Sequence, residues 1–169
     1  IKHCIITGAS QGLGAAFANY LLELGYCPII ISRSMNNLTN LESGIDPDKS
    51  KNIIKLALDL TQKNAIDILF KYLKDNQIYP ELLINNVGIS HYGNFVGCKT
   101  SEFQSIIDLN IVSFTNLTHK YLNYMNGHKA AILNVASTYA FRSAENQAVY
   151  AASKSYIYSL SRTLRKELA

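Results

Sequence analysis

The sequence of 169 residues predicts an α/β protein built on a doubly wound parallel sheet with helices on both faces. Short apolar runs alternate along the chain with longer segments that carry apolar residues at helical spacing. The apolar runs are continuous, which is typical of strands buried on both faces of a parallel sheet. No internal repeat or Pro/Gly-rich linker interrupts this pattern, so residues 1–169 are predicted to form one domain.

The alternation predicts five strands and five helices. The expected strands cover residues 4–7, 28–32, 53–58, 82–85 and 130–135. The expected helices cover residues 12–24, 35 to about 43, 63–74, 103 to about 124, and 149–168. A turn over residues 44–47 should close the second helix. Since ligands of such sheets bind beyond the carboxyl ends of the strands, the residues that follow each strand are the expected site.

Composition and charge disfavour several classes of partner. The net charge is +4, and the densest basic cluster (Arg162, Arg165 and Lys166) ends a predicted helix, where it complements the helix dipole. We therefore expect no nucleic-acid partner. No apolar run reaches the about 18 residues that a membrane-spanning helix needs, and no secretory leader opens the sequence. A cytoplasmic protein without a membrane span is expected.

The cysteines and histidines predict no metal site. Cys4, Cys27 and Cys98 lie far apart, without a CxxC motif or a paired Cys/His spacing, so neither a zinc site nor a disulfide framework is expected. Cys4 and Cys27 fall in predicted strands, where free cysteine is a small buried hydrophobe. Of the histidines, His91 follows a strand and is the one expected to face a cleft.

A glycine-rich turn follows the first strand, in the run Thr7-Gly8-Ala9-Ser10-Gln11-Gly12-Leu13-Gly14. Glycine at positions 8, 12 and 14 lets the backbone turn tightly and approach a diphosphate without a Cβ in the way. The helix that begins near Gly12 would aim its free N–H groups at that negative charge. Because the turn joins the first strand to the first helix, it is predicted to bind a nucleotide rather than to be a plain structural turn.

The end of the second strand bears on the choice of nicotinamide cofactor. NAD-specific sites place an acid there to hold the ribose 2′-hydroxyl, but this chain has Ser32-Arg33-Ser34. Arg33 can pair with a 2′-phosphate, and Ser34 can donate a hydrogen bond to it. NADP(H) is therefore predicted over NAD(H). The alternative is that Arg33 is only a solvated loop charge.

Further motifs follow the glycine turn in a fixed order. An acid follows the third strand, Asn85-Asn86-Val87-Gly88 follows the fourth, an asparagine lies inside the long helix, and a serine follows the fifth strand; a YxxxK run then opens the last helix. These residues are Asp59, Asn110, Ser137, Tyr150 and Lys154. Together with the TGxxxGxG spacing of the turn, they resemble the short-chain dehydrogenases/reductases over essentially the whole chain, with Val87 where the family has alanine.

The resemblance implies a Rossmann-type fold and an oxidoreductase that moves a hydride between a nicotinamide cofactor and a carbonyl or alcohol. It implies that Asp59 holds the adenine amino group. The cofactor-binding residues expected from the turn and the resemblance together are Gly8, Ser10, Gln11, Gly12, Leu13, Gly14, Arg33, Ser34, Asp59, Leu60, Asn86, Val87, Gly88, Tyr150 and Lys154.

Four residues are expected to carry the chemistry: Asn110, Ser137, Tyr150 and Lys154. Tyr150 and Lys154 lie four residues apart on one helix face, so the ammonium would favour the phenolate of Tyr150, the acid/base, and would also hold the nicotinamide ribose. The hydroxyl of Ser137 would hydrogen-bond the substrate oxygen. The resemblance implies that Asn110 bends its helix and holds a relay water; the alternative is an amide that merely faces a neighbouring loop.

The substrate stays open at this point. Ser32-Arg33-Ser34 and residues 85–88 look somewhat like the branch that reduces 3-oxoacyl thioesters and 17-ketosteroids. The alternatives are an NAD-linked alcohol or polyol dehydrogenase and a non-catalytic nucleotide-sensing or scaffold domain. Residues expected to line the substrate cleft are Tyr139, Phe141, Asn146 and Gln147. The resemblance implies a homodimer or homotetramer, and members usually continue into further C-terminal strands and a lid, so the domain is expected to be C-terminally incomplete.

Overall fold

The computed structural model describes residues 1–42, 45 and 47–168, and these form two compact units. The first unit consists of Ile1–Val87 and Asn116–Leu133, and the second of Gly88–Thr115 and Asn134–Ala169. Each unit is described by itself below. The expectation of a single domain over residues 1–169 stays a prediction.

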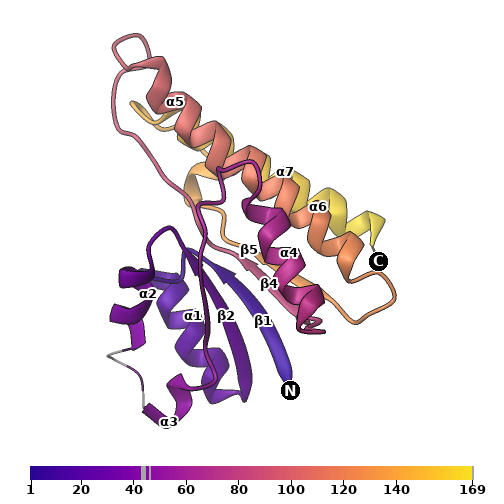
Figure 1. The fold of residues 1–169 in the computed structure, drawn as a ribbon. Coiled ribbons are helices and arrows are strands. Elements are labelled where there is room, and N and C mark those ends of the chain that lie inside the picture. Colours follow the sequence, from indigo (N-terminus) through magenta and orange to yellow (C-terminus); the bar gives the residue numbers. More distant parts are fainter. Residues whose placement is uncertain (43–44, 46, 169) are drawn as a thin grey trace. The chain divides into compact units, whose positions relative to one another are not determined.

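A five-stranded sheet of order β3-β2-β1-β4-β5 forms the centre of the first unit (Figure 1). Its strands are β1 (Lys2–Thr7), β2 (Tyr26–Ser32), β3 (Ile54–Ala57), β4 (Leu82–Asn85) and β5 (Ala131–Asn134). The pairs β1–β2, β1–β4 and β2–β3 are parallel. The predicted doubly wound parallel sheet is thus confirmed. Its strand order reverses between β1 and β4, the place where such sheets bind ligands.

Both faces of the central strands are buried, as their continuous apolar runs predict. Cys4, Ile6 and Ile30 pack in one core cluster with Ala18 and Leu21 of the first helix. Successive side chains of a strand point to opposite faces, so Ile5, Ile29 and Leu83, which are also fully buried, lie on the other face. Cys4 is buried as predicted, whereas Cys27 is only half-buried.

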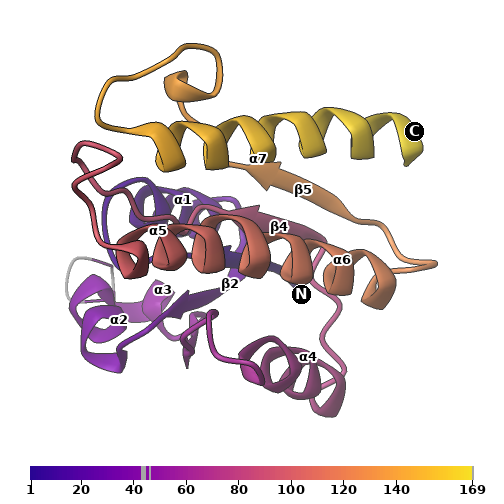
Figure 2. The same cartoon turned by 90° about the horizontal axis from the view of Figure 1, so that it is seen from above.

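Strand β5 differs from the central strands. It lies at the edge of the sheet, beside β4 (Figure 2), and the side chain of Leu133 is 39% exposed. Ala131 is exposed as well, while Ile132 and Asn134 are half-buried. The alternation of exposed and half-buried residues is typical of a strand with one covered face. The strand predicted over residues 130–135 is thus present over Ala131–Asn134, but it is not buried on both faces as the continuous apolar run predicts.

Five helical segments belong to the first unit, the last of them in part. They are α1 (Gly12–Glu23), α2 (Met35–Glu42), α3 (Pro47–Ser50), α4 (Ala65–Asp75) and the 116–124 part of α6 (Phe114–Tyr124). In Figure 1, α1 lies on one side of β1 and β2 and α4 on the other. Of the predicted turn over residues 44–47, positions 44 and 46 lie outside the described residues, as does position 43, the predicted end of the second helix; Pro47 begins the short helix α3.

The second unit contains the helix that carries Asn110 and the helix that carries Tyr150. A single helix was predicted over residues 103–124. The structure instead has α5 (Thr100–Ile107), a π-helical segment η1 (Asp108–Ser113) and then α6. The helix starts earlier than predicted because the Glu102 carboxylate accepts a hydrogen bond from the Lys99 N–H (2.9 Å) and so stabilises the first turn.

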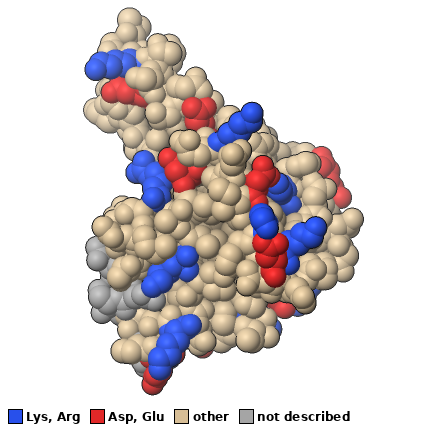
Figure 3. Space-filling view, in the orientation of Figure 1, with Lys and Arg blue, Asp and Glu red and all other residues tan. Residues whose placement is uncertain are grey.

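The last helix, α7 (Ala148–Glu167), follows a single turn of 3₁₀ helix, η2 (Thr138–Ala140). Within the described ranges, no helix combines the length and the apolar character needed to cross a membrane. On the face shown in Figure 3, basic and acidic side chains are intermixed and do not gather by sign.

Candidate active site

The glycine turn between β1 and α1 is packed too tightly for side chains at two of its positions. A Cβ on Gly14 would lie 2.3 Å from the carbonyl oxygen of Gly8, and a Cβ on Gly8 would lie 2.9 Å from the Cα of Val87. Gly8 also has φ of +65°, in the left-handed region that favours glycine. Gly12 has φ of +56° but open space around it, so its requirement is conformational only. The turn therefore presents bare backbone, as predicted.

Thr7 and Asn86 join this turn to the end of β4. The buried hydroxyl of Thr7 accepts hydrogen bonds from the backbone N–H groups of Asn86 (3.0 Å) and Val87 (3.1 Å). The Asn86 amide in turn donates to the carbonyl oxygens of Thr7 (3.1 Å) and Gly8 (3.0 Å). Two loops that are far apart in the sequence are thus held together at the point where the strand order reverses. The spacing of the glycines does not predict this role for Thr7, because its partners lie 79 and 80 residues further along the chain.

Helix α1 begins at Gly12, as predicted, and its first turn is open to an anion. Gln11 stands at the N-cap with extended backbone, and its side chain makes no capping hydrogen bond. Ser10 is half-buried, and Leu13 is 61% exposed at the start of the helix. Since the first N–H groups of a helix have no partners within the helix, they are available to a phosphate here.

Arg33 and Asp59 follow the neighbouring strands β2 and β3. Arg33 is exposed, Ser34 is half-buried, and Leu60 after Asp59 is buried. The Asp59 carboxylate accepts hydrogen bonds from the Thr61 hydroxyl (2.7 Å) and the Thr61 N–H (3.0 Å). These bonds hold the pKa of Asp59 below its usual value despite partial burial, and the positive charge of Arg33 lowers it further. Arg33 is thus close enough to act on the carboxylate where the adenine is expected.

In the second unit, a buried lysine lies beside Tyr150. Lys154 is only 4% exposed, and its ammonium donates a hydrogen bond to the carbonyl oxygen of Val135 (3.0 Å). The ammonium nitrogen lies 5.8 Å from the centre of the Tyr150 ring. Burial lowers the pKa of Lys154. Tyr150 and Lys154 therefore lie side by side on one face of α7, as the sequence predicts.

Asn110 is fully buried and makes a closed set of hydrogen bonds. Its Oδ1 accepts from the Ile89 N–H (3.0 Å), and its Nδ2 donates to the Ile89 carbonyl (2.8 Å) and to the Ser153 hydroxyl (3.1 Å). Ser153 donates to the carbonyl oxygen of Tyr150 (2.7 Å). Asn110 lies in the π-helical segment η1. The bend that the resemblance implies at Asn110 stays a prediction. Ser153 was not among the predicted site residues, although it stands in the YxxxK run itself.

Gly88 brings the loop after β4 against the same residues. A Cβ on Gly88 would lie 3.3 Å from both the Asn110 Oδ1 and the Lys154 Nζ. A distance of 3.3 Å is shorter than the usual contact distance of a Cβ atom, so a side chain at this position would crowd both polar atoms. Glycine leaves the space beside them free. The run Asn86-Val87-Gly88 therefore contributes to both groups of residues, Asn86 and Val87 in the first unit and Gly88 in the second.

Ser137 reaches Tyr150 through Tyr139. Ser137 is the N-cap of η2, and its Oγ accepts a hydrogen bond from the Tyr139 N–H (3.2 Å). The Tyr139 ring packs edge-on against the Tyr150 ring, with centres 6.1 Å apart. Because a hydroxyl both accepts and donates, the proton of Ser137 remains available to an oxygen of a bound molecule. The four predicted catalytic residues all lie in this unit.

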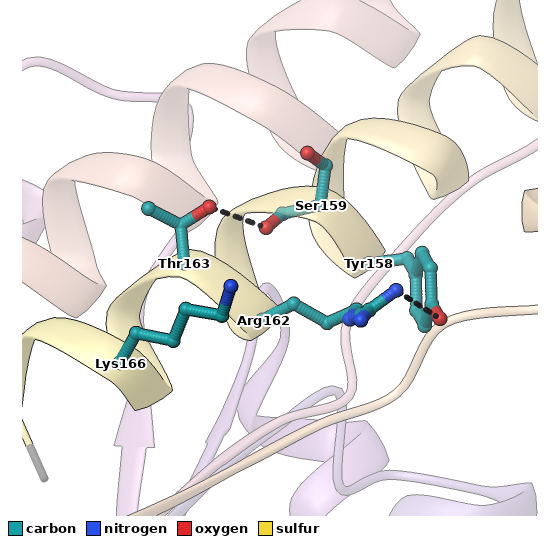
Figure 4. A pocket seen from close by; sticks show the side chains of 5 residues that line it. All are labelled: Tyr158, Ser159, Arg162, Thr163 and Lys166. Carbon is teal, nitrogen blue, oxygen red and sulfur yellow. Dashed lines mark hydrogen bonds between the residues drawn. The ribbon is translucent and has the colours of Figure 1, made fainter.

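Two other tyrosines of α7 have packing roles. The Tyr156 hydroxyl lies 2.8 Å from that of Thr115, and the Tyr158 ring packs edge-on against Phe141. Arg162 donates to the Tyr158 hydroxyl (3.3 Å), and both line a polar hollow on α7 (Figure 4). That hollow includes none of the predicted site residues. Phe141, expected in the substrate cleft, thus contacts Tyr158 and not Tyr150.

Comparison with known proteins decides the family. The sequence profile described as short chain dehydrogenase matches residues 2–169. The chain belongs to the short-chain dehydrogenase family. It is therefore an oxidoreductase, and the predicted resemblance, fold class and enzyme class are confirmed.

Relatives within this family are similar over nearly the whole chain. An uncharacterized oxidoreductase of Staphylococcus epidermidis is 27% identical, and the match covers 99% of this chain and 72% of that protein. Mouse 17-beta-hydroxysteroid dehydrogenase type 3 is 30% identical over 96% of this chain and 54% of its own length. The crystal structure of 3-ketoacyl-(acyl-carrier-protein) reductase from Brucella melitensis, complexed with NADH, superposes with a TM-score of 0.88 at 28% identity, covering 99% of this chain and 69% of that one.

Proposed function

We propose that this short-chain dehydrogenase catalyses the reversible NADPH-dependent reduction of a carbonyl, in a ketone, an aldehyde or a 3-oxoacyl group, to an alcohol. The observation that carries the proposal is the buried ammonium of Lys154 beside the ring of Tyr150. A buried charge is unfavourable unless it is used or paired, and the carbonyl of Val135 accepts only one of its three N–H donors. Among the described residues no other acceptor takes the remaining donors, so they can hold hydroxyl groups of a bound cofactor.

A dinucleotide fits the residues of the first unit. At Gly8 and Gly14 a Cβ would collide with backbone, so the turn offers a surface that a diphosphate can approach closely. The uncapped start of α1 supplies N–H donors to the same charge. A nicotinamide dinucleotide is proposed because the Brucella melitensis reductase was solved with NADH.

NADP(H) is proposed over NAD(H) because of the residues that follow β2. The run Ser32-Arg33-Ser34 contains no carboxylate to hold a ribose 2′-hydroxyl or to repel a 2′-phosphate. Arg33 is exposed, and its charge acts on Asp59, the residue proposed to hold the adenine. A guanidinium in this position pairs well with a phosphate. NAD(H) is the alternative, since the related reductase binds it.

The nicotinamide, when bound, supplies the hydride for reduction. Tyr150 donates its phenolic proton to the carbonyl oxygen as negative charge develops there. The ammonium of Lys154 stabilises the resulting phenolate electrostatically, and its free N–H donors hold the ribose hydroxyls. The hydroxyl of Ser137 donates a hydrogen bond to the same carbonyl oxygen and stabilises the transition state.

Asn110 positions the segment that contains Tyr150. Through Ser153 its amide is linked to the carbonyl of Tyr150, and through Ile89 it is linked to the loop after β4. Both N–H donors of the amide are occupied, so a relay water would bind to the second lone pair of Oδ1 or to the backbone carbonyl of Asn110. The relay role therefore remains part of the proposal.

The proposal extends to the substrate, the location and the oligomeric state of the protein. A ketone is proposed as the substrate because two similar proteins are a 3-ketoacyl-(acyl-carrier-protein) reductase and a 17-beta-hydroxysteroid dehydrogenase. A cytoplasmic location and a homodimer or homotetramer are proposed as well. Cell fractionation tests the location, and light scattering of the purified protein tests the oligomeric state.

Cofactor preference is tested by fluorescence titration of the protein with NADPH and with NADH. Tighter binding of NADPH is expected, and Arg33→Ala should remove most of the difference because the 2′-phosphate loses its partner. Lys74→Ala, at the exposed end of α4, serves as a matched loss of charge. Tighter binding of NADH by the wild type would overturn the cofactor proposal.

Catalysis is tested by a panel of ketones, aldehydes and 3-oxoacyl thioesters, with NADPH oxidation as the readout. Tyr150→Phe keeps the ring that packs on Tyr139 and removes only the proton donor. A substrate that the wild type reduces should be turned over about 10²–10⁴-fold more slowly by this variant. An unchanged rate would exclude Tyr150 as the acid. If the cofactor binds but no carbonyl is reduced, a nucleotide-sensing domain is the better assignment.

A further inference from the structure

A cluster of three potential metal ligands lies on the loop between β4 and α5, in the second unit. One nitrogen of His91, the sulfur of Cys98 and a carboxylate oxygen of Glu102 all lie within 4.8 Å of one another. The Nε2 of His91 and the Oε2 of Glu102 are 3.4 Å apart. All three side chains are half-buried, so an ion can reach them from solvent.

The spacing of these atoms suits a tetrahedral ion. Zinc bonds of about 2.0–2.3 Å to N, O and S donors place the donor atoms about 3.3–3.6 Å apart. The pair His91 and Glu102 already has this separation. Small side-chain rotations bring Cys98 into range, because no pair of the three donor atoms is more than 4.8 Å apart. The cluster is therefore close to the geometry that binding requires.

Glycine at position 93 keeps the space between two of the ligands open. A Cβ on Gly93 would lie 2.7 Å from the Cys98 sulfur and 3.2 Å from the His91 Nε2. Its φ is outside the left-handed region, so backbone conformation does not require glycine here. Any larger residue would fill the space beside the sulfur and the imidazole. Glycine therefore leaves the sulfur of Cys98 and the Nε2 of His91 unobstructed on this side.

Backbone hydrogen bonds hold two of the ligands in place. The N–H of Cys98 donates to the Asn94 carbonyl (3.1 Å), and the Asn94 side chain accepts from the Val96 N–H (3.0 Å), which fixes the turn before the cysteine. Glu102 is held in the first turn of α5 by the Lys99 N–H (2.9 Å). A carboxylate has further lone pairs available for a metal. Ligands that are positioned in advance lose less entropy on binding.

We propose that His91, Cys98 and Glu102 form a binding site for a divalent zinc-like ion, with three protein ligands and one open coordination position. A thiolate with an imidazole favours zinc over magnesium or calcium, which prefer oxygen ligands. The sequence predicts no metal site here because no cysteine and histidine have ligand spacing and the third ligand is a glutamate. The proposal does not depend on the proposed function.

The ion would stabilise the segment that leads into α7. The loop is joined to that segment by the Gly93 N–H, which donates to the Asn146 carbonyl (3.0 Å), and by the Asn146 amide, which donates to the Tyr92 hydroxyl (3.3 Å). Asn146 stands four residues before Tyr150 and has φ of +59°. An ion on the loop therefore fixes one side of this connection, and binding should raise the melting temperature of the protein.

The test is titration of untagged, chelator-treated protein with Co²⁺, followed by displacement with Zn²⁺. One Co²⁺ per chain is expected, with the charge-transfer absorption of a cobalt–thiolate bond, and Zn²⁺ should remove that absorption and raise the melting temperature. Cys98→Ser should abolish the absorption. His91→Gln and Glu102→Gln should weaken binding by at least about tenfold.

Cys27→Ser is the matched control, since Cys27 is half-buried in β2 and lies outside the cluster. It should bind like the wild type, and so should Tyr150→Phe, whatever the catalytic rate. Glu102→Gln keeps an acceptor for the Lys99 N–H, so it separates loss of a ligand from loss of folding. Absence of saturable one-to-one binding, or a thiolate absorption that survives in Cys98→Ser, would overturn the proposal.

Discussion

Each unit contains an asparagine that links predicted site residues of that unit, and the two asparagines differ in their surroundings. Asn86 is half-buried, and its amide donates to the carbonyls of Thr7 and Gly8. Asn110 has no exposed surface, and its amide donates to Ile89 and Ser153 and accepts from Ile89. Both cross-link segments that are far apart in the sequence.

The two regions are built in different ways. In the glycine turn, the backbone lies so close to Gly14 that no side chain fits there. The region of Tyr150 is shaped by a buried polar network that ends in a buried cation, Lys154. Substitutions in the glycine turn should therefore lower stability through steric clashes and through the loss of hydrogen bonds that water can partly replace. Substitutions in the region of Tyr150 should leave polar or charged groups unpaired in the interior, which costs more.

Lys154→Met should give the largest effect, and activity and stability should not fall together. The variant keeps an apolar stem and removes the ammonium, so turnover of a carbonyl substrate should fall by about 10²–10⁴-fold. The pKa of Lys154 is lowered by burial, which means that the folded state holds the charge at a cost. The relief of this cost offsets the Val135 carbonyl that the variant leaves unpaired, so the melting temperature should change little. Steady-state kinetics and calorimetry measure the two quantities.

Lys74→Met, at the exposed end of α4, is the control and should change neither quantity. A variant of Lys154 that unfolds at a clearly lower temperature but still turns over at the wild-type rate would contradict the prediction. That result would make the ammonium a structural partner of Val135 and nothing more.

Asn110→Asp and Asn86→Asp compare the two asparagines directly. Each substitution keeps the size of the side chain, removes two donated hydrogen bonds and adds a negative charge next to carbonyl or hydroxyl oxygens. Asn110 is fully buried, so its variant should lose about 3–5 kcal/mol of the free energy of unfolding. Asn86 is half-buried and water can reach it, so about 1–3 kcal/mol is expected. Urea unfolding gives both values, and an equal or reversed order would refute the comparison.

The fold and the glycine turn could be predicted because their signals are local. Strand β4 begins and ends at the predicted residues, Leu82 and Asn85, because a fully buried strand is a continuous apolar run with polar residues after it. The turn from Gly8 to Gly14 is predicted by the spacing of its glycines alone. Its hydrogen bonds with Asn86 cannot be predicted in this way, since they join loops that meet only in the folded chain.

The region of Tyr150 could be predicted only in part, for the same reason. Residues Tyr150 and Lys154 share a helix face, which spacing reveals. The π-helical segment around Asn110 depends on partners from two other segments, Ile89 and Ser153, so no local pattern marks it. The cluster with Cys98 is a similar case. It forms only because the loop after β4 turns back on the start of α5.

Alkaline pH should distinguish Cys4, in the first unit, from Lys154, in the second. Burial raises the pKa of the Cys4 thiol from 9.0 to about 12, so the unfolded chain releases this proton at a lower pH than the folded chain. Stability from Cys4 is complete below pH 9.0 and is lost toward about pH 12, at no more than about 1.4 kcal/mol per pH unit. For Lys154 the pKa in the folded state is lowered from 10.5, so the unfolded chain keeps this proton to a higher pH than the folded chain. The contribution of Lys154 to stability therefore rises with pH until the pH reaches about 10.5.

The measurement is the free energy of unfolding in urea at several values of pH above neutrality. Cys4→Ala should be less stable than the wild type near neutral pH, because it leaves a small cavity, but should lose less stability above pH 9.0. Lys154→Met should lose more stability than the wild type over the same pH range, because it lacks the stability that the titration of Lys154 adds as the pH rises. Parallel curves for all three proteins would show that neither group titrates differently on folding.

Gln147 should give the smallest effect, and its sign should be opposite to that of Asn110. Its Oε1 is buried and has no hydrogen-bond partner among the described residues, three positions before Tyr150. An unpaired buried acceptor destabilises the folded state, so Gln147→Met, which removes it at similar size, should leave the free energy of unfolding unchanged or raise it by up to about 1 kcal/mol. Gln147→Glu adds a charge at the same place and should lower it. If Gln147→Met is clearly destabilising, the oxygen has a partner in solution, such as an ordered water, and the network around Tyr150 extends further than Ser153.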